Sequence, residues 1–198
     1  MKYLNSNSVK KIIDNKNISI NPYKTEFQGP NLYYCHLGER LLIPKDGTLA
    51  DTRKLSKNLY EEIKITNHFD LLPGQFILAE TFETFSTDLS HIIRLFNSSS
   101  LARLGVIHCA LGMINPVCGT KQPVRLTLEL TNTSTFKVRL YPTIKDSKNT
   151  EEISWGTEVL KIAVCEHEKT DIAYDDWKGS LYGKDIKVTG SKIDRRYK

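Results

Sequence analysis

The sequence lacks the features that mark several large classes of protein. No run approaches the about 18 apolar residues of a membrane-spanning helix. The polar start "MKYLNSNSVKKII" has no apolar stretch long enough for a signal peptide. The four cysteines form no CxxC pair, so a disulfide framework or a zinc ribbon is not expected. These absences predict a cytoplasmic protein with reduced thiols and no membrane contact.

The usual motifs for phosphate binding, acyl transfer and zinc chemistry are also missing. The chain has no GxxxxGK[ST] loop, no GxGxxG, no GxSxG and no HExxH, and it lacks the HxE…PCxxC signature of zinc base deaminases. Its five histidines are scattered, and Cys165 with His167 is interpreted as the end of a surface strand. A metal site needs three or four ligands at defined spacing, so none is predicted.

The charge is mildly positive. Lys and Arg number 28 against 23 Asp and Glu, a formal net charge of +5. That excess is compatible with a phosphate-bearing ligand and too small to indicate nucleic acid, so a nucleic-acid partner is unlikely on this ground. A length of 198 residues suits one domain, residues 1–198.

The pattern of apolar residues predicts an all-β fold with one short helix. Val9, Ile12 and Ile13 recur at helical spacing after a candidate cap, Ser8, so a helical segment is expected within about residues 1–17. Short runs rich in β-branched and aromatic residues follow at 39–44, 75–85, 91–96, 124–132, 136–144 and 157–166. Such runs, separated by turns, are typical of a sandwich or barrel. A loop is predicted at 145–154 and a basic, mobile tail at 175–198.

Two segments invite a functional interpretation. In "RLTLELTN" the leucines share one face of a strand, while Thr127, Glu129 and Thr131 share the other. That face meets either water or a pocket, and in a pocket a buried carboxyl with a raised pKa can move protons. The second segment, "NSSSLARLGVIHCALGMINP" (97–116), places three serines and an arginine among apolar residues. Serine hydroxyls and turn N–H groups can bind phosphate, although a solvated turn has the same composition.

Five motifs in order carry a family resemblance. They are "GPNLYYCHLG", "LLPGQFILAETFE", "SSSLARLG", "INPVCG" and "LTLELTN". From about Ile18 to the C-terminus, the chain resembles the dCTP deaminase branch of the dUTPase/dCTP deaminase superfamily. The resemblance implies a distorted jelly-roll or β-barrel of the dUTPase-like β-clip type, and a homotrimer with active sites between subunits. It also implies hydrolysis of dCTP, or a related cytosine deoxynucleotide, to dUTP and ammonia, without zinc and with Mg²⁺ carried by the triphosphate.

The resemblance also assigns roles to residues. Glu129 would shuttle protons, Ser99 and the backbone carbonyl of Leu111 would hold the attacking water, and Arg103 would steady negative charge at the reacting centre. The residues expected to bind substrate are Ser98, Ser100, Leu111, Asn115, Tyr174, Tyr182 and Lys184.

Several positions depart from the family pattern. Ser98 stands where an arginine is usual, Asn115 replaces an aspartate, and Cys118 replaces an aromatic residue that packs on the deoxyribose. Leu181 and Asp185 occupy positions that usually bind phosphate. Two alternatives to an active deaminase therefore stay open. One is a catalytically inactive nucleotide-binding trimer that acts as a sensor or regulator. The other is a dUTPase or a bifunctional enzyme, against which Asn115 argues because an amide cannot act as a base.

Overall fold

A single curled sheet dominates the fold. The computed structural model describes residues 1–145, 152–182 and 185–197. Within these residues the main sheet has the strand order β8-β10-β6-β3-β14-β7-β9, with β1 beside β14, β2 beside β6 and β4 beside β3. Its strands are β1 (Lys2–Tyr3), β2 (Ser19–Asn21), β3 (Tyr33–Pro44), β4 (Tyr60–Lys64), β6 (Phe76–Ser86), β7 (His91–Asn97), β8 (Val106–His108), β9 (Met113–Ile114), β10 (Val124–Asn132) and β14 (Glu158–Glu166).

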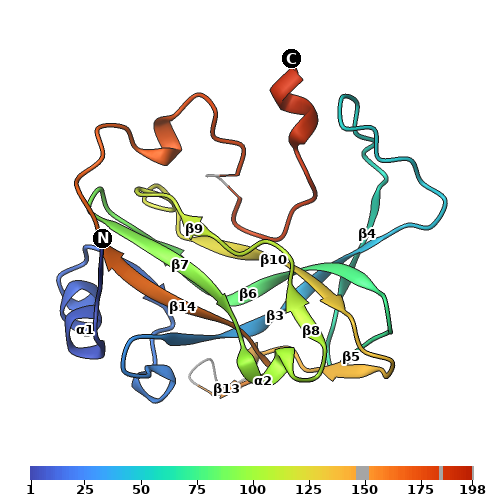
Figure 1. The fold of residues 1–198 in the computed structure, drawn as a ribbon, viewed down its shortest axis with the longest axis horizontal. Coiled ribbons are helices and arrows are strands. Elements are labelled where there is room, and N and C mark those ends of the chain that lie inside the picture. Colours follow the sequence, from blue (N-terminus) through green and yellow to red (C-terminus); the bar gives the residue numbers. More distant parts are fainter. Residues whose placement is uncertain (146–151, 183–184, 198) are drawn as a thin grey trace.

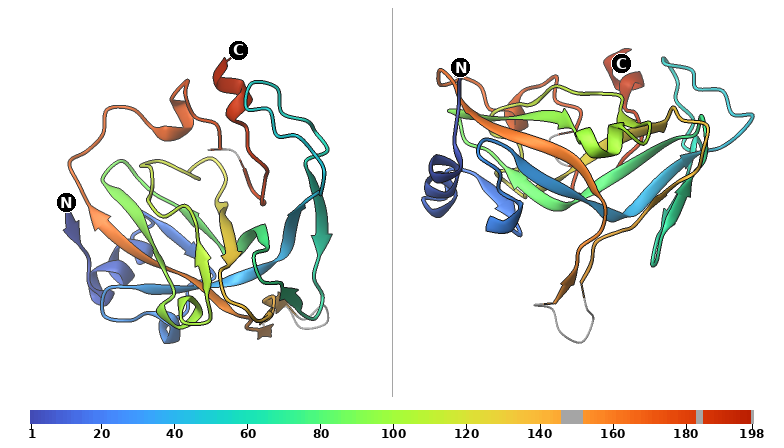
Figure 2. Two further views of the ribbon diagram at one scale, coloured as in Figure 1. Left: turned by 45° about the vertical axis from the view of Figure 1, so that its right-hand side comes forward. Right: turned by 60° about the horizontal axis from the view of Figure 1, so that its bottom comes forward.

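The sheet curls into a half-barrel (Figures 1 and 2). All named pairs are antiparallel, and irregular registers interrupt the β10·β6, β14·β3 and β3·β6 ladders. Such irregularities bend strands and increase their twist, which lets one sheet wrap around its own core. The prediction of an all-β fold is confirmed; the homotrimer stays a prediction, since the structure holds one chain.

The core lies inside the curl. Alternate residues of the long strands point inward, so Leu37, Leu41, Ile77, Leu128 and Leu160 are fully buried. Burying each of these side chains is worth about 1.5–3 kcal/mol relative to exposure, which is why the β-period of the sequence fixes which face turns inward.

The N-terminal helix α1 (Ser6–Asp14) packs its Val9 side against the sheet. Its cap is Asn5, whose side chain accepts a hydrogen bond from the Ser8 N–H at 3.0 Å, so the prediction of Ser8 as cap is wrong by one turn. Asn competes as well as Ser for this position. No helix in the described part of the chain has the length and apolar content needed to cross a membrane.

The smaller elements differ more from expectation. The run expected at 136–144 forms only β11 (Val138–Leu140), paired with β5 (Phe69–Leu71). The predicted loop begins and ends in a short ladder of β12 (Ile144–Lys145) and β13 (Ile153–Ser154). A second helix, α2 (Ser99–Ala102), follows β7. The remaining helices are the 3-10 turns η1 (Thr25–Phe27), η2 (Tyr174–Asp176) and η3 (Ile193–Tyr197).

Candidate functional site

Strand β10 presents Glu129 to a cavity. The leucines of β10 are buried on one face, and Arg125, Thr127 and Glu129 are half-buried on the other. This second face lines a cavity of about 450 Å³, so Glu129 does not point into open water. The other lining residues come from β4, β6, β7, β9, the loop after β9, the start of β10 and the C-terminal residues: Tyr60, Phe76, Leu78, Leu95, Met113, Ile114, Asn115, Cys118, Val124, Leu126, Tyr174, Tyr182, Asp185, Thr189, Gly190 and Ser191.

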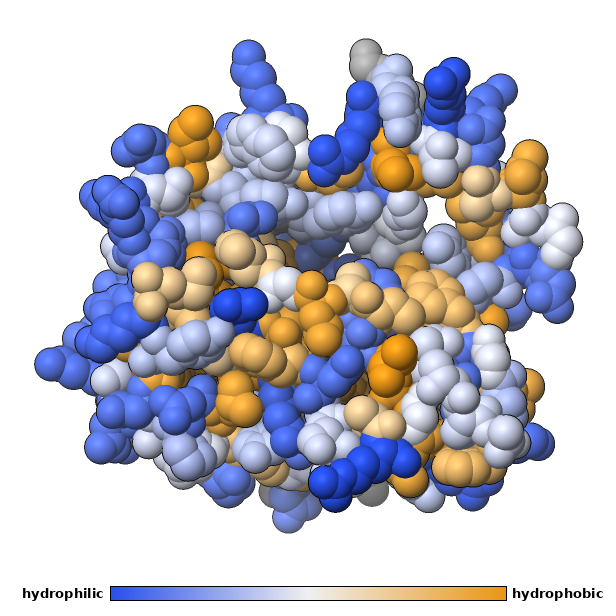
Figure 3. All heavy atoms as spheres, viewed as in Figure 1, coloured by the Kyte–Doolittle hydropathy of each residue, from blue (hydrophilic) through white to orange (hydrophobic). Residues whose placement is uncertain are grey.

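The cavity lies under the C-terminal segment, by which we mean residues 172–182 and 185–197. The space-filling view shows the surface hollowed beneath this segment, with hydrophilic side chains along the upper rim (Figure 3). Tyr174 and Tyr182 both line the cavity, and their expected closure over a triphosphate stays a prediction. Lys184 lies outside the described residues, so its role stays a prediction.

Burial sets the acid-base properties of Glu129. Its side chain is 31% exposed, and burial raises its pKa above the ordinary value. A carboxyl in this state gives up and takes back a proton nearer to neutral pH than an exposed one does. The phenol of Tyr60 and the thiol of Cys109 lie near enough to feel its charge, and burial raises the pKa of each.

His108 lies beside the Glu129 carboxylate. Its Nε2 lies 3.4 Å from Glu129 Oε2. The imidazole is buried, which lowers its pKa to about 4, so it is neutral at physiological pH. In the sequence this histidine is a candidate only as a metal ligand, and nothing in the local pattern shows that β8 places it beside β10.

Arg125 is the only cationic side chain lining the cavity among the described residues. Its guanidinium donates to the backbone carbonyls of Thr81 (2.7 Å) and Phe82, and lies 3.8 Å from the Glu80 carboxylate. These contacts hold the group rigidly at the wall. The sequence motif contains this arginine, and alternation places it on the same face as Glu129, but the pattern alone assigns it no role.

The serine segment lies elsewhere. Ser98 is buried, and its hydroxyl donates to Glu158 Oε1 at 2.7 Å. Ser99, Ser100 and Arg103 are exposed and do not line the cavity of their own chain. Within the part of the chain that the structure describes, the Arg103 guanidinium has no partner. Within one chain these residues therefore stay outside the cavity that Glu129 lines.

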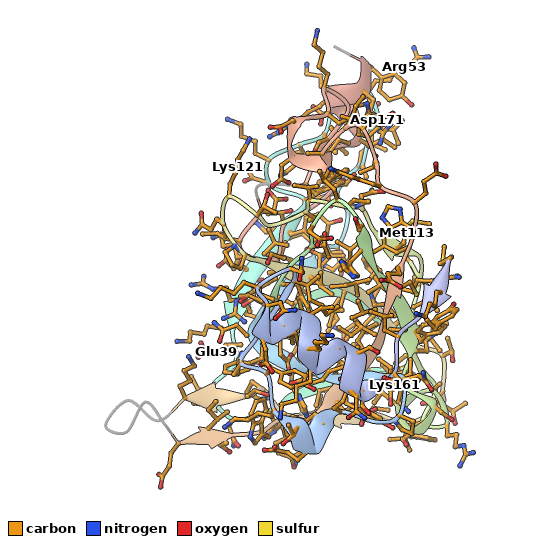
Figure 4. All side chains as sticks on the ribbon, turned by 90° about the vertical axis from the view of Figure 1, so that its left-hand side faces the viewer. Glu39, Arg53, Met113, Lys121, Lys161 and Asp171 are labelled. Atoms are coloured by element: carbon orange, nitrogen blue, oxygen red, sulfur yellow. The ribbon has the colours of Figure 1, made fainter. Side chains whose placement is uncertain are left out.

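The views agree on this separation. Figure 1 places α2 at the lower edge of the molecule and the C-terminal segment at the upper edge. Figure 4 shows Met113, a cavity residue, close below the C-terminal segment, and Lys161 at the lower end. Lys161 lies 3.9 Å from Glu158, the partner of Ser98. The water-holding, charge-stabilising and phosphate-binding roles expected of Ser99, Arg103 and Ser100 stay predictions.

The loop between β8 and β10 contains three predicted positions. Leu111 is 46% exposed and does not line the cavity, whereas Asn115 and Cys118 do. Between them Val117 has φ of 60°, a conformation that a β-branched residue rarely adopts. The substrate-binding roles of these residues stay predictions. In the described residues no three His, Cys, Asp or Glu side chains are grouped so that they can hold a metal ion.

Comparison with known proteins adds a family to this geometry. Residues 3–145 match the family model described as dCTP deaminase-like. A "dCTP deaminase, dUMP-forming" of Nanoarchaeum equitans is 28% identical over 96% of this chain and 96% of its own. Proteins with the same name from Bifidobacterium adolescentis and Dictyoglomus turgidum are 35% and 31% identical over 65% and 70% of this chain, and 67% and 74% of theirs.

A solved structure supports the fold. The 2'-deoxycytidine 5'-triphosphate deaminase of Agrobacterium tumefaciens superimposes with a TM-score of 0.59 at 11% identity. The match covers 82% of this chain and spans about half, 47%, of the length of that one.

The comparisons confirm one prediction and correct another. The resemblance to the dCTP deaminase branch, and with it a hydrolytic deaminase, is confirmed at the level of the family. The prediction of dUTP as product, and of a role in dUTP biosynthesis, is wrong, because these relatives are named for forming dUMP. The prediction of dUTP rested on Asn115, which stands where an aspartate able to act as a base is usual. The family model covers more than half of the chain, and the chain therefore belongs to the dCTP deaminase-like family.

Proposed function

We propose that the chain hydrolyses dCTP to dUMP, with loss of ammonia from the cytosine and of pyrophosphate from the triphosphate. The shared name of the relatives supports the substrate and the product. The observation that carries the proposal is the position of Glu129, half-buried on the wall of a 450 Å³ cavity with its pKa raised by burial. That volume is in the range of small-molecule sites.

Glu129 performs the proton transfers of deamination. The carboxylate takes a proton from a water, whose oxygen then bonds to C4 of the ring while N3 gains a proton. The resulting tetrahedral carbon loses its amino group as ammonia, once the nitrogen has been protonated, and the C4–N bond breaks. A single carboxyl can carry the protons in turn, and its raised pKa suits both directions.

A second copy of the chain completes the site. A triphosphate carries several negative charges, yet the only cation lining the cavity among the described residues is Arg125, and backbone carbonyls already engage it. Helix α2 offers exposed residues Ser99 and Ser100, and it is followed by Arg103, which has no recorded partner among the residues that the structure describes. We therefore propose a homotrimer in which α2 of one subunit faces the cavity of the next, so that Ser99 and Arg103 reach the attacking water and the developing charge.

Release of dUMP requires a second hydrolysis. Water must bond to the α-phosphorus as the bond to the pyrophosphate oxygen breaks, and a proton of that water passes to the departing pyrophosphate oxygen. Mg²⁺ enters with the triphosphate as part of the substrate and offsets charge on the leaving group. Tyr174, Tyr182 and Ser191 line the cavity, and a hydroxyl group can donate a hydrogen bond to a phosphate oxygen.

The test is a panel of cytosine and uracil nucleotides, ribo and deoxy, with one to three phosphates, incubated with Mg²⁺. Ammonia, pyrophosphate and the nucleotide product are each measured. We expect equal amounts of ammonia, pyrophosphate and dUMP from dCTP. Accumulation of dUTP would contradict the product, whereas tight binding of dCTP without any ammonia would favour the inactive nucleotide-binding alternative.

A further inference from the structure

His108 lies between two groups that the proposed reaction needs. It ends β8, whose pairing with β10 sets Leu130 opposite His108. Beyond it runs the segment Cys109–Gly112, which contains the Leu111 carbonyl. The imidazole is buried, with 1% of its side chain exposed, and faces Glu129 across 3.4 Å.

Hydrogen bonds fix the tautomer of the ring. The backbone N–H of Ala110 donates to His108 Nδ1 at 3.1 Å, so Nδ1 is the acceptor. Because the ring is neutral, its one proton is on Nε2. Nε2 is buried and makes no hydrogen bond within the described residues; the groups that approach it are Glu129 Oε2, at 3.4 Å, and the backbone carbonyl of Thr127. A small closure of the 3.4 Å gap gives an N–H···O⁻ bond to the carboxylate.

The backbone around His108 is anchored on both sides. Its own N–H donates to Asn97 Oδ1 at 2.7 Å, directly before the serine segment. The next residue, Cys109, donates its N–H to the Glu129 carbonyl at 2.7 Å. The backbone that carries the imidazole therefore cannot shift without moving β8, and His108 lies between the carboxyl of β10 and the turn that carries Leu111.

We infer that His108 is a positioning residue for deamination. Its Nε2–H orients the Glu129 carboxylate toward the cavity, and its Nδ1 holds the Ala110 N–H, which fixes the distance between that carboxylate and the Leu111 carbonyl. The Leu111 carbonyl is expected to hold the attacking water and Glu129 to take its proton, so the spacing of the two groups decides whether that transfer is possible. The inference rests on the proposed function, and it goes beyond it by assigning a histidine that neither the motif nor the family name provides.

Two substitutions test the roles of the two ring nitrogens of His108 separately. In His108→Asn the amide oxygen can still accept from Ala110, but no donor reaches Glu129. In His108→Gln the amide N–H can reach toward Glu129 in place of Nε2. We expect His108→Asn to lower kcat for ammonia release by about 10- to 100-fold with KM changed less than about threefold, and His108→Gln to recover much of the loss. Thermal unfolding of both variants checks that each folds.

The pH dependence of kcat distinguishes a positioning role of His108 from a purely structural one, which would leave it unchanged. Loss of a donor to the carboxylate raises its pKa, so the acid limb of kcat shifts to higher pH in His108→Asn and stays near that of the wild type in His108→Gln. Tyr60 and Cys109 are the other titratable groups near Glu129, and they are unchanged in both variants. Equal loss in the two variants with an unshifted acid limb would overturn the inference.

A measurement without turnover distinguishes failure of this inference from failure of the proposed function. Long-range ¹H–¹⁵N spectra of the imidazole report which nitrogen carries the proton. We expect an Nε2–H tautomer for His108 between pH 5 and 8, as a group with a pKa of about 4 requires, and a shift of its Nε2 signal in Glu129→Gln. An unshifted Nε2 signal would overturn the pairing of His108 with Glu129, even if the enzyme is active. A shifted signal in a protein that releases no ammonia would support the pairing and contradict only the proposed function.

Discussion

The backbone N–H of Val188 donates to Glu80 Oε2 at 2.9 Å, joining the C-terminal segment to β6. Both residues are buried, and Val188 packs between Leu42 and Leu78. Burial raises the pKa of Glu80, and the contact shows that the segment over the cavity is docked at a defined point. Farther along, Lys192 pairs with Asp185, whose Oδ2 it reaches at 2.6 Å.

Weaker packing of the Val188 side chain should loosen the C-terminal segment over the cavity. Val188→Ala deletes two buried methyl groups, worth about 1–2 kcal/mol of docking free energy. We expect faster amide hydrogen exchange in residues 185–195 and a higher KM for dCTP, with kcat changed less. Ile186→Ala is the matched control, because Ile186 belongs to the same segment and is 47% exposed. Equal effects of the two substitutions would contradict the anchor.

Val117 should be replaceable with a gain in stability. Its φ of 60° costs a β-branched residue about 1–3 kcal/mol. Val117→Gly removes the strain, and because glycine also gains entropy in the unfolded chain, we expect a net rise of about 1 kcal/mol in the free energy of unfolding. Urea titration measures it. Val117→Ala keeps a Cβ in the strained conformation and should gain less; a larger gain for alanine than for glycine would rule out backbone strain as the cause.

The buried carboxyl of Glu129 should cost stability at neutral pH. Its folded pKa is raised above the ordinary 4.5, so the folded state binds a proton more tightly than the unfolded state does. Stability from this group is present below pH 4.5 and is lost as pH rises through the folded pKa. Glu129→Gln should therefore unfold at higher denaturant concentration than the wild type at pH 7, and the difference should vanish near pH 4.

The same titration predicts the acid limb of the reaction. The carboxylate must be ionised to take the first proton, so kcat should rise with pH through the raised pKa of Glu129, above the range of an exposed glutamate. Measurement of ammonia release from pH 4 to 8 checks this. An acid limb of kcat centred on the ordinary glutamate pKa of 4.5, together with equal free energies of unfolding for Glu129→Gln and the wild type at pH 7, would contradict the burial argument.

Mixed oligomers test whether two subunits share each site. Arg103→Ala and Glu129→Gln should each be inactive alone. If α2 of one subunit serves the cavity of the next, random mixing in equal amounts restores one intact site in about four in a cyclic assembly. A mixture of Glu129→Gln with Glu129→Ala is the control and should stay inactive. No recovery after confirmed subunit exchange would place Arg103 outside the site.

The sequence predicted those features that depend on local pattern. Alternation in "LTLEL" was enough to put Glu129 opposite a buried leucine face, and the long strands fell close to their predicted ranges, although β3 begins at Tyr33 rather than Glu39. Local pattern could not show that the polar face of β10 meets a cavity, because that depends on the curl of the sheet and on Val188 docking 108 residues from its partner. Nor could it show His108 beside Glu129, since only the β8·β10 ladder brings them together.

The most direct measurement of the central claim is ammonia release from dCTP with Mg²⁺ by the wild type, Glu129→Gln and Glu61→Gln. Glu61 is an exposed glutamate on β4, so its substitution changes charge equally and touches no cavity wall. We predict that the wild type and Glu61→Gln release ammonia and dUMP at similar rates and that Glu129→Gln, folded and able to bind dCTP, loses at least about 1000-fold in kcat. Unchanged ammonia release by Glu129→Gln would contradict the account.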